Sequence, residues 1–521
     1  MRAAFGSDAG LKEAFLDSRA WDGTISKVIL THVVIASVSG LLMGYNLCAI
    51  SSILAPVEHS LELCGTECAG LQACSCARKQ LAVSACPVGA MVGGLLGGLV
   101  ADRYGRCLGM MAMDMCCAIG CASMSFARTG AMAVLFFVGR FLVGVAAGAA
   151  GAIANTYIAE ISPPARRGTL VAVAEVGVCS GCLLAFIAAS LFGDARWHWT
   201  VGTAGGVALA QLFAVALFLV ESPLWLARQA ALGRWRMRTP AESLWLSWQG
   251  ADVSDGIEIA AGANGSSVGV CSGSACTLAS AGASKSGRSD HVSGLEVARR
   301  AALSLGLDPA LLLESKVAGS GDAARLSGVH PLWYHRRKLA VSLGLASAHA
   351  ATAANVVLYY SRDVLQSTGL TEPLLANLSV GVVKFVGAAA AMAVVEKCGR
   401  VSLLTGGALV LCIGHGGLAL SRSANLSLGS LLLFIFSWSV SWAGLQWTVV
   451  CELLPQSIRG VGIGMATAIY WLLSFVIAQT FESVSELVGQ QATFLTFGTL
   501  SAAAMAFAWT MVPETRGRPL E

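Results

Sequence analysis

The sequence predicts an all-α polytopic membrane protein, with twelve transmembrane helices arranged as two six-helix bundles. Three observations lead to this fold class: a strongly apolar composition, a series of long apolar runs, and motifs that occur twice. Of the 521 residues, 55% are hydrophobic and 12% are charged, about half the charged fraction of an ordinary soluble domain. The 34 basic and 30 acidic residues nearly balance, so no nucleic-acid partner is expected. A water-soluble enzyme of this size is excluded, because its surface would need many more polar side chains.

The apolar runs have the length, about 20 residues, that crosses the roughly 30 Å hydrocarbon core of a lipid bilayer. The first six lie at 29–54, 80–101, 107–127, 132–158, 169–193 and 198–220. The second six lie at 338–361, 374–395, 402–421, 428–453, 460–482 and 491–511. The stretch Met1–Thr24 lacks the layout of a cleaved signal peptide, so we expect the first run to remain as a membrane anchor.

The distribution of the runs divides the chain into five parts. These are an N-terminal tail (1–28), a first bundle (29–221), a linker (222–337), a second bundle (338–512) and a C-terminal tail (513–521). Lys and Arg are modestly enriched in the loops on one side, which predicts that both tails and the linker are cytoplasmic. The middle of the linker is rich in Gly, Ser and Ala, a composition typical of flexible segments.

Three motifs of the first half recur in the second half, 292 to 294 residues later. The pairs are Asp102–Arg106 with Glu396–Arg400, Glu160–Gly168 with Glu452–Gly460, and Glu221-Ser with Glu514-Thr. Such a repeat predicts two homologous bundles in parallel orientation. A binding site between the halves, near the middle of the membrane, is typical of transporters built in this way.

The motifs resemble those of the sugar porter family of the major facilitator superfamily. Gly98–Arg106 is similar to the superfamily's loop between helices 2 and 3, and Gly139–Gly168 to the family's helix 4–5 signature. Glu221–Leu226 and Pro513–Gly517 resemble the motifs after helices 6 and 12. The resemblance implies the major facilitator fold and transport of a small polar solute, a hexose or related sugar, by alternating access. We expect no enzymatic activity, because the sequence shows no nucleophile–base set and no metal-ligand cluster, and we expect no cofactor and no metal.

Two other functions stay open at this point. One is a porter for a polyol, an organic ion or a zwitterion, and the other is a non-transporting nutrient receptor that signals through the linker. The expected partners are the solute and the lipid bilayer, with protons as an open alternative, and the plasma membrane is the default location.

Acidic and basic residues recur at the ends of the helices that we expect to face the cytoplasm. These candidate gating residues are Asp102, Arg103, Arg106, Glu160, Arg167, Glu396, Arg400, Glu452 and Arg459. Ion pairs among them are expected to join the cytoplasmic ends of the two bundles when the cavity opens outward and to break when it opens inward. The alternative is that these charges only anchor helix ends at the lipid headgroups.

The candidate substrate site departs from the family pattern. Two tryptophans, Trp447 in helix 10 and Trp471 in helix 11, match the tryptophans that line the family's cavity, and Asn355 in helix 7 matches the family's Asn. His349 stands where the family has Gln, and Gln446 is a replacement amide in helix 10. The prolines that precede the tryptophan in the family's helix 10 are absent, which removes an expected break in that helix.

Two ionisable residues, Glu175 in helix 5 and Lys384 in helix 8, replace a family Gln and Asn inside membrane spans. Such residues are costly in a bilayer and usually face a cavity or a partner. Three interpretations remain open: a structural salt bridge between the halves, a grip on a charged or zwitterionic solute, and a proton-carrying role for Glu175.

Helix 1 carries Gly44-Tyr-Asn46 where proton-coupled family members tend to have Asp. Because an Asn side chain cannot bind and release a proton, facilitated diffusion is favoured over proton coupling unless Glu175 substitutes. His349 is expected to be a hydrogen-bonded cavity residue rather than a proton relay.

Four cysteines, Cys64, Cys68, Cys74 and Cys76, cluster in the first external loop. An even number outside the cell predicts up to two disulfides, with three possible connectivities. A zinc site is disfavoured because the spacing is poor and no His lies nearby.

Overall fold

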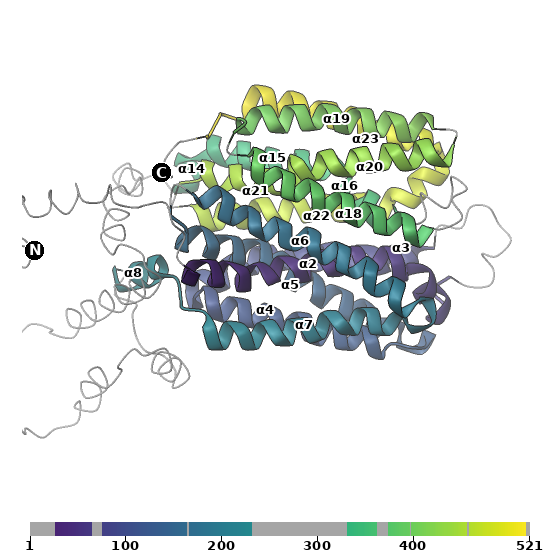
Figure 1. Cartoon of the computed structure of the whole chain (residues 1–521), viewed down its shortest axis with the longest axis horizontal. Coiled ribbons are helices and arrows are strands. Elements are labelled where there is room, and N and C mark those ends of the chain that lie inside the picture. The colour runs from purple at the N-terminus through teal and green to yellow at the C-terminus, as the bar shows by residue number, and fades with distance from the viewer. Residues whose placement is uncertain are drawn as a thin grey trace, which may run out of the picture.

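The computed structural model confirms the predicted fold class. It describes residues 27–64, 76–163, 166–231, 331–361, 373–395, 397–421, 423–455 and 458–516. In this part of the chain, 12 helical segments are long and apolar enough to cross a membrane, and they run side by side as one elongated bundle (Figure 1).

The first half contributes six long helices. They are α2 (Lys27–Ser60), α3 (Ala77–Tyr104), α4 (Arg106–Phe126), α5 (Ala133–Ile161), α6 (Arg167–Phe192) and α7 (Trp197–Phe218). Their lengths of 21 to 34 residues give at least about 30 Å of helix at 1.5 Å per residue. Each is therefore long enough to span the hydrocarbon core.

The second half contains the matching six spans, two of them in two pieces. The helices are α15 (Arg336–Ala351), α16 (Ala354–Tyr359), α18 (Pro373–Val394), α19 (Arg400–Leu420), α20 (Ala424–Val440), α21 (Trp442–Leu453), α22 (Arg459–Val488) and α23 (Gln490–Met511). The seventh span is interrupted between α15 and α16, where Ala353 takes a left-handed backbone conformation with φ of 56°.

The tenth span is also interrupted, so the expectation that losing the family prolines removes this break was wrong. The break between α20 and α21 falls at Ser441. Its hydroxyl donates to the carbonyl of Ser437 at 2.7 Å, and its backbone N–H donates to the same oxygen at 3.1 Å. Serine side chains that bond the carbonyl four residues back often bend helices.

The crossing of α3 and α5 shows why so many glycines lie inside the spans. A β-carbon on Gly93 would lie 2.0 Å from the carbonyl oxygen of Val145, and one on Gly148 would lie 2.0 Å from that of Ala90. The two backbones therefore touch directly, as small residues permit between membrane helices.

Both described ends of the linker 222–337 are helical. The short helix α8 (Pro223–Ala231) follows the first half, and α14 (Pro331–Tyr334) precedes the second. The side chains of Trp225 and Gln229 donate to the carbonyl oxygen of Asp102 at 3.0 and 2.9 Å, which docks α8 on the first bundle. The predicted flexible segment, 250–293, lies outside the described residues.

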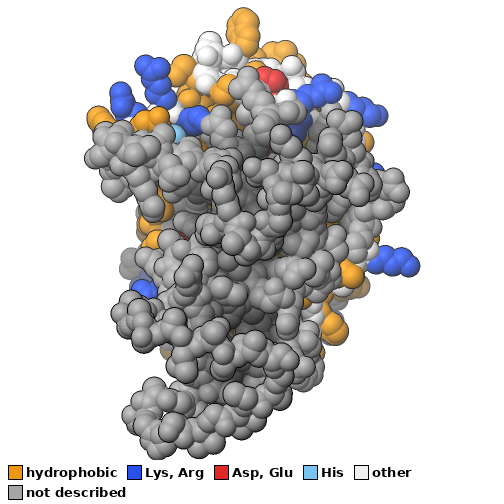
Figure 2. Space-filling view, turned by 90° about the vertical axis from the view of Figure 1, so that its left-hand side faces the viewer, with side chains coloured by type: hydrophobic (Ala, Val, Ile, Leu, Met, Phe, Trp, Pro, Cys, Tyr) orange, Lys and Arg blue, Asp and Glu red, His pale blue; other side chains and the backbone are white. Residues whose placement is uncertain are grey.

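The two ends of the bundle carry different loops. The end with the loop that contains Cys64 and Cys76 is called the disulfide end. The opposite end, where α4 begins at Arg106 and α19 begins at Arg400, is called the acid–base end. Figure 2 looks onto the acid–base end, and Lys and Arg side chains are prominent around its described rim. This distribution agrees with the sidedness expected from the sequence.

Candidate functional site

A central cavity lies between the two halves and opens toward the acid–base end. It encloses about 1020 Å³ of space, including its open mouth. The first half contributes residues of α2, α5 and α6, and the second half contributes residues of α18, α20, α21 and α22. Several lining residues, among them Gly168, Val395 and Thr448, lie within two turns of helix ends at the acid–base end.

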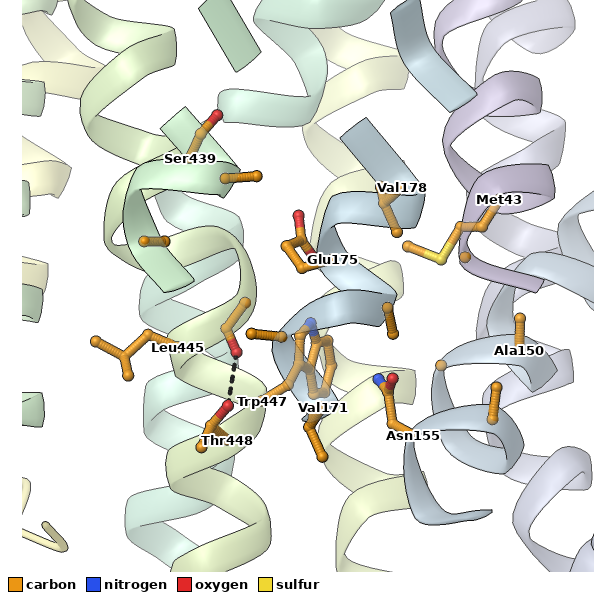
Figure 3. Close-up of a pocket in the computed structure, with 18 of the residues that line it drawn as sticks. Met43, Ala150, Asn155, Val171, Glu175, Val178, Ser439, Leu445, Trp447 and Thr448 are labelled. Carbon is orange, nitrogen blue, oxygen red and sulfur yellow. Dashed lines mark hydrogen bonds between the residues drawn. The ribbon is translucent and has the colours of Figure 1, made fainter. Parts of the chain in front are cut away.

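The lining combines aromatic walls with a few polar groups, as is usual for small-molecule sites. Three predicted residues line it: Glu175, Trp447 and Trp471. Figure 3 shows Glu175 of α6 and Trp447 of α21 side by side in this space, with Asn155 across from them on α5. Four polar lining residues were missed from the sequence: Asn155, Ser439, Thr448 and Thr467.

The halves are joined at the disulfide end by polar contacts between α3 and α22. Lys79 pairs with Glu482 at 3.0 Å. The hydroxyl of Ser84 donates to Gln479 Oε1 at 2.5 Å, and Gln479 Nε2 donates to Gln80 Oε1 at 3.3 Å. These contacts close the disulfide end in this conformation.

His349 has both ring nitrogens engaged inside the second half. The indole N–H of Trp438 can only donate, and it lies 3.0 Å from His349 Nε2. The proton of the neutral ring is therefore on Nδ1, which donates to Gln446 Oε1 at 2.9 Å. His349 and Gln446 are 3% and 0% exposed, and neither lines the central cavity. This geometry agrees with a hydrogen-bonded His rather than a proton relay.

Asn355 is separated from the central cavity by Tyr470. The Asn355 amide donates to the Tyr470 hydroxyl at 2.7 Å, and the Tyr470 ring stacks on His349 at 4.8 Å. The same ring contacts Trp447 and Trp471, with ring centres 5.5 and 5.0 Å apart. Asn355 and His349 line a smaller pocket of their own instead.

Lys384 lies behind the cavity rather than on its wall. It is 2% exposed, and its ammonium donates to Cys182 Sγ of the first half at 3.0 Å. It also lies 5.2 Å above the ring of Trp438. Within the described residues no ion pair within 4.0 Å joins it to Glu175, which instead accepts from Cys179 Sγ at 3.8 Å. The structural salt bridge is not formed in this conformation.

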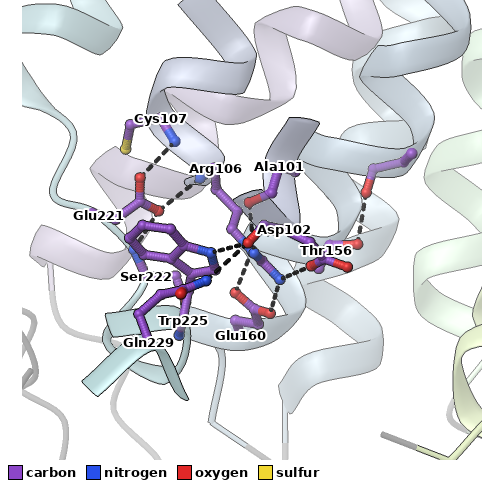
Figure 4. Close-up of polar contacts among 11 residues, drawn as sticks. Ala101, Asp102, Arg106, Cys107, Thr156, Glu160, Glu221, Ser222, Trp225 and Gln229 are labelled. Atoms are coloured by element: carbon purple, nitrogen blue, oxygen red, sulfur yellow. Dashed lines mark hydrogen bonds and ion pairs between the residues drawn. The ribbon is translucent and has the colours of Figure 1, made fainter. Parts of the chain in front are cut away.

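At the acid–base end of the first half, a buried guanidinium ties three helices together (Figure 4). Arg106 donates from Nε and Nη2 to the carboxylate of Glu160 at 3.1 and 2.9 Å, which is a bidentate pair. Its Nη2 also lies 3.1 Å from Asp102, and its Nη1 donates to the carbonyl of Ala101.

The second half repeats this arrangement. Arg400 Nη1 donates to the carbonyl of Val395 at 3.0 Å, and Nη2 pairs with Glu452 at 3.4 Å. The predicted gating residues Arg106 and Arg400 thus form their described ion pairs within one half each.

Four further gating candidates occupy different positions. Arg103 is exposed and lies over the ring of its neighbour Tyr104, and Arg459 Nε donates to the carbonyl of Leu454 at 3.0 Å. Glu396 and the side chain of Arg167 lie outside the described residues. Whether the cluster acts as a gate therefore stays a proposal.

The third repeated motif has a structural role that the sequence did not reveal. The Glu221 carboxylate accepts the backbone N–H groups of Arg106 and Cys107 at 2.9 and 3.1 Å, and so caps the first turn of α4. A β-carbon on Gly105, which has φ of 104°, would lie 2.3 Å from this carboxylate.

Glu514 caps α19 in the same way, through the N–H groups of Arg400 and Val401 at 2.9 and 3.1 Å. The two caps differ in their electrostatics. Burial raises the pKa of Glu221 above its ordinary value, although backbone hydrogen bonds act against it. For Glu514 burial acts in the same direction, but its backbone hydrogen bonds prevail and lower the pKa below 4.5.

The structure pairs Cys64 with Cys76 as a disulfide, 12 residues apart. Cys68 and Cys74 lie outside the described residues. Among the residues that are described, no group of three or more His, Cys, Asp or Glu side chains is placed to hold a metal ion.

Two parallel halves of six membrane spans around a central cavity define the chain as a polytopic protein of the major facilitator fold. The family model for "Sugar (and other) transporter" matches residues 32–234 and 314–521. The chain therefore belongs to this family, which confirms the resemblance seen in its motifs, and it is a transporter-type protein rather than an enzyme.

Among its relatives, the D-xylose transporter of Levilactobacillus brevis is 26% identical over 499 residues, which is 93% of either chain. The glucose facilitated diffusion protein of Zymomonas mobilis is 26% identical over 530 residues, 97% of this chain and 98% of the relative. The partially occluded inward-open structure of XylE from E. coli matches with a TM-score of 0.70 at 20% identity, covering 95% of this chain and 100% of the other.

Proposed function

We propose that this protein carries a hexose or a related monosaccharide across a membrane by alternating access. The observation that supports this most directly is the cavity between the halves, where Trp447 and Trp471 offer aromatic faces beside the polar groups of Asn155 and Glu175. Aromatic rings stack on the apolar faces of sugars, while amides and carboxylates bond their hydroxyls. Relatives named for D-xylose and glucose support the same class of solute.

The conformation supports a transport cycle of two states. The polar contacts of Ser84 and Gln479 close the disulfide end, while the cavity reaches toward the acid–base end. If the acid–base end is cytoplasmic, as the basic rim favours, this is an inward-facing state. Rocking of the halves would break the contacts at the disulfide end and bring together the acid–base ends of the helices that line the cavity, whereas α3 and α22 already touch at that end through Asp102 and Gly460. We place the protein in the plasma membrane, with the Cys64–Cys76 disulfide outside.

The mode of transport depends on where a proton can bind. Asn46 provides no proton site in helix 1, which favours facilitated diffusion. Glu175, at the cavity wall, is the alternative proton carrier from the sequence. A second carboxyl, Asp114, is considered in the next subsection.

The test is uptake of labelled glucose by purified protein in liposomes. Saturable uptake supports the proposal, and Trp471→Ala should raise KM about tenfold, equivalent to ~1.4 kcal/mol of lost stacking. The matched control is Trp509→Ala, because Trp509 is 76% exposed on the outer surface of α23. Absence of both uptake and exchange of glucose and xylose by folded protein would refute the proposed solute.

A specific observation favours an organic cation or zwitterion as the second candidate. Glu175 lines the cavity; its hydrogen bond comes from the Cys179 thiol, and Lys384 acts on it electrostatically without forming an ion pair within 4.0 Å. A screen of labelled cations and zwitterions, repeated with Glu175→Gln, would test this. A receptor role would be contradicted if deletion of residues 250–293 left uptake intact.

A further inference from the structure

A carboxylic acid is buried inside the first half at a position that plays no part in the site described above. Asp114 lies on α4, about two turns from its start at Arg106, and it is 0% exposed. Within the part of the chain that the structure describes, neither of its carboxyl oxygens has a hydrogen-bond partner. Because an ionised carboxylate is very costly to bury without a partner, the group carries a proton in this conformation.

Asp114 lines a small cavity between α2, α4 and α5. The polar groups beside it are Ser39 and Asn46 of α2 and Cys117 of α4. Cys117, one turn beyond Asp114, accepts a hydrogen bond from the Asn46 amide at 3.6 Å. The buried carboxyl therefore shares a cavity with the helix 1 position at which a carboxylate is missing.

This small cavity adjoins the central cavity. Met43, Ala147 and Ala150 line both of them. The barrier between the two spaces thus consists of one flexible methionine side chain and two alanines. Movement of Met43 would give water in the central cavity access to the carboxyl of Asp114.

Neither buried arginine on the helices around Asp114 is paired with it. Arg106, on the same helix, is held by Glu160 and Asp102. Arg140, on α5, donates to the carbonyl oxygens of Ala82 and Asn46.

The other helices packed against α4 contribute polar but no charged groups beside Asp114. On α7, Gln211 donates to Ser39 Oγ at 2.6 Å at the wall of the same cavity. On α3, the charged residues lie at the two ends of the helix: Arg78 and Lys79 in the first turn, and Asp102 and Arg103 in the last turn. On α2, Tyr45 donates its hydroxyl to the carbonyl of Thr200 instead.

We propose that Asp114 is the proton-binding site of this protein and couples sugar transport to a proton gradient. The inference rests on the proposed function for its sugar readout. In the inward-facing conformation the dry cavity retains the protonated acid. When Met43 moves and water enters from the central cavity, which opens toward the acid–base end, the acid gives its proton to this water and becomes a carboxylate, with no other bond changed. After the halves rock, water that enters from the disulfide end returns a proton to the carboxylate. Since only the protonated acid is stable in the dry cavity, proton binding shifts the equilibrium between the inward-facing and outward-facing conformations.

The test compares wild-type protein with Asp114→Asn in liposomes, measuring both glucose accumulation and glucose exchange at equal concentration on both sides. One proton per sugar allows a gradient of one pH unit to sustain about tenfold accumulation. We expect wild-type protein to approach this value and Asp114→Asn to show no accumulation, while exchange persists. The matched control is Met115→Ala, because Met115 is the next residue of α4, is 46% exposed and lies outside the cavity, so this variant should accumulate as wild type does.

A second measurement does not depend on sugar. Infrared spectra of the purified protein should show a protonated carboxyl band that disappears at high pH in wild type and is absent in Asp114→Asn. If Asp114→Asn fails to fold, this band and its pH dependence in wild type still test the assignment, with Glu175→Gln used to recognise any contribution from the other buried acid.

The double variant Asn46→Asp/Asp114→Asn moves the carboxyl to the other wall of the cavity and is expected to restore accumulation.

Three results would overturn the proposal: wild-type uptake that does not depend on the proton gradient, unchanged accumulation in Asp114→Asn, or a carboxyl band that is unaltered by this substitution. Absence of glucose uptake and exchange in wild type, with the band present, would instead refute the proposed solute and leave the proton site supported.

Discussion

Gln479 holds the two halves together at the disulfide end, and its removal should shift the protein toward the opposite conformation. Its side chain makes two contacts across the interface, accepting from Ser84 at 2.5 Å and donating to Gln80 at 3.3 Å. A net hydrogen bond contributes about 0.5–1.5 kcal/mol, and the second of these is long. Gln479→Ala should therefore destabilise the closed disulfide end by about 1–2 kcal/mol, which is a factor of roughly 5–30 in the ratio of the two conformations.

Hydrogen–deuterium exchange measured by mass spectrometry reports this shift without labels. Amide exchange should become faster in the disulfide-end halves of α3 and α22 and slower where the acid–base ends come together. The matched control is Thr480→Ala. Thr480 is the next residue of α22, is exposed on the outer surface, and bonds only carbonyls of its own helix in the structure.

Two results would refute this reasoning. Equal exchange in Gln479→Ala and Thr480→Ala would show that the polar contacts do not set the conformational balance. Faster exchange at both ends of the bundle would show that Gln479 stabilises the fold as a whole rather than one of its two states.

Three further predictions concern stability in detergent, measured by thermal unfolding. Because the pKa of Glu514 is lowered in the folded protein, its cap stabilises the fold above pH 4.5, and this stabilisation is lost as pH falls through the folded-state pKa. Glu514→Gln should remove this sensitivity to acid. Glu221→Gln should not remove it, because the pKa of Glu221 is raised. Arg106→Lys should cost about 2 kcal/mol, because an ammonium cannot reproduce the bidentate pair, while Arg103→Lys at the exposed neighbour should be neutral. Cys64→Ser opens a 12-residue crosslink and should cost about 3 kcal/mol, and a reducing agent should have no further effect on that variant.

The fold could be predicted from the sequence because two independent signals agree. Hydropathy locates the spans, and the repeated motifs pair the halves. Each repeat has the same physical role in both halves, as shown by Arg106 with Glu160 and Arg400 with Glu452. The break at Ser441 could not be found in this way, because neither the hydropathy of the span nor the repeated motifs mark its position.

The sequence predicted only some of the residues that line the central cavity, because hydropathy does not show which way a helix face points. A polar residue inside an apolar run reveals depth in the membrane but not the direction in which its helix face points. Glu175 proved to line the cavity, while Lys384 at similar depth lies behind it. Asn155 and Asp114 are also polar residues inside apolar runs, so both could have been chosen from the sequence as candidate functional residues.

Two of the predicted substrate-binding side chains, Asn355 and His349, already form their hydrogen bonds within the protein, and this limits the free energy that they can contribute to binding a sugar. The Asn355 amide bonds Tyr470, and both nitrogens of His349 are engaged. A sugar hydroxyl that reached Asn355 would have to displace the Tyr470 hydroxyl, so one hydrogen bond would replace another with little net gain. If the site binds a sugar as proposed, affinity comes mainly from stacking on Trp447 and Trp471 and from the Glu175 carboxylate, whose described hydrogen bond comes from the Cys179 thiol. A site of this kind would select for ring shape before it selects for the pattern of hydroxyls.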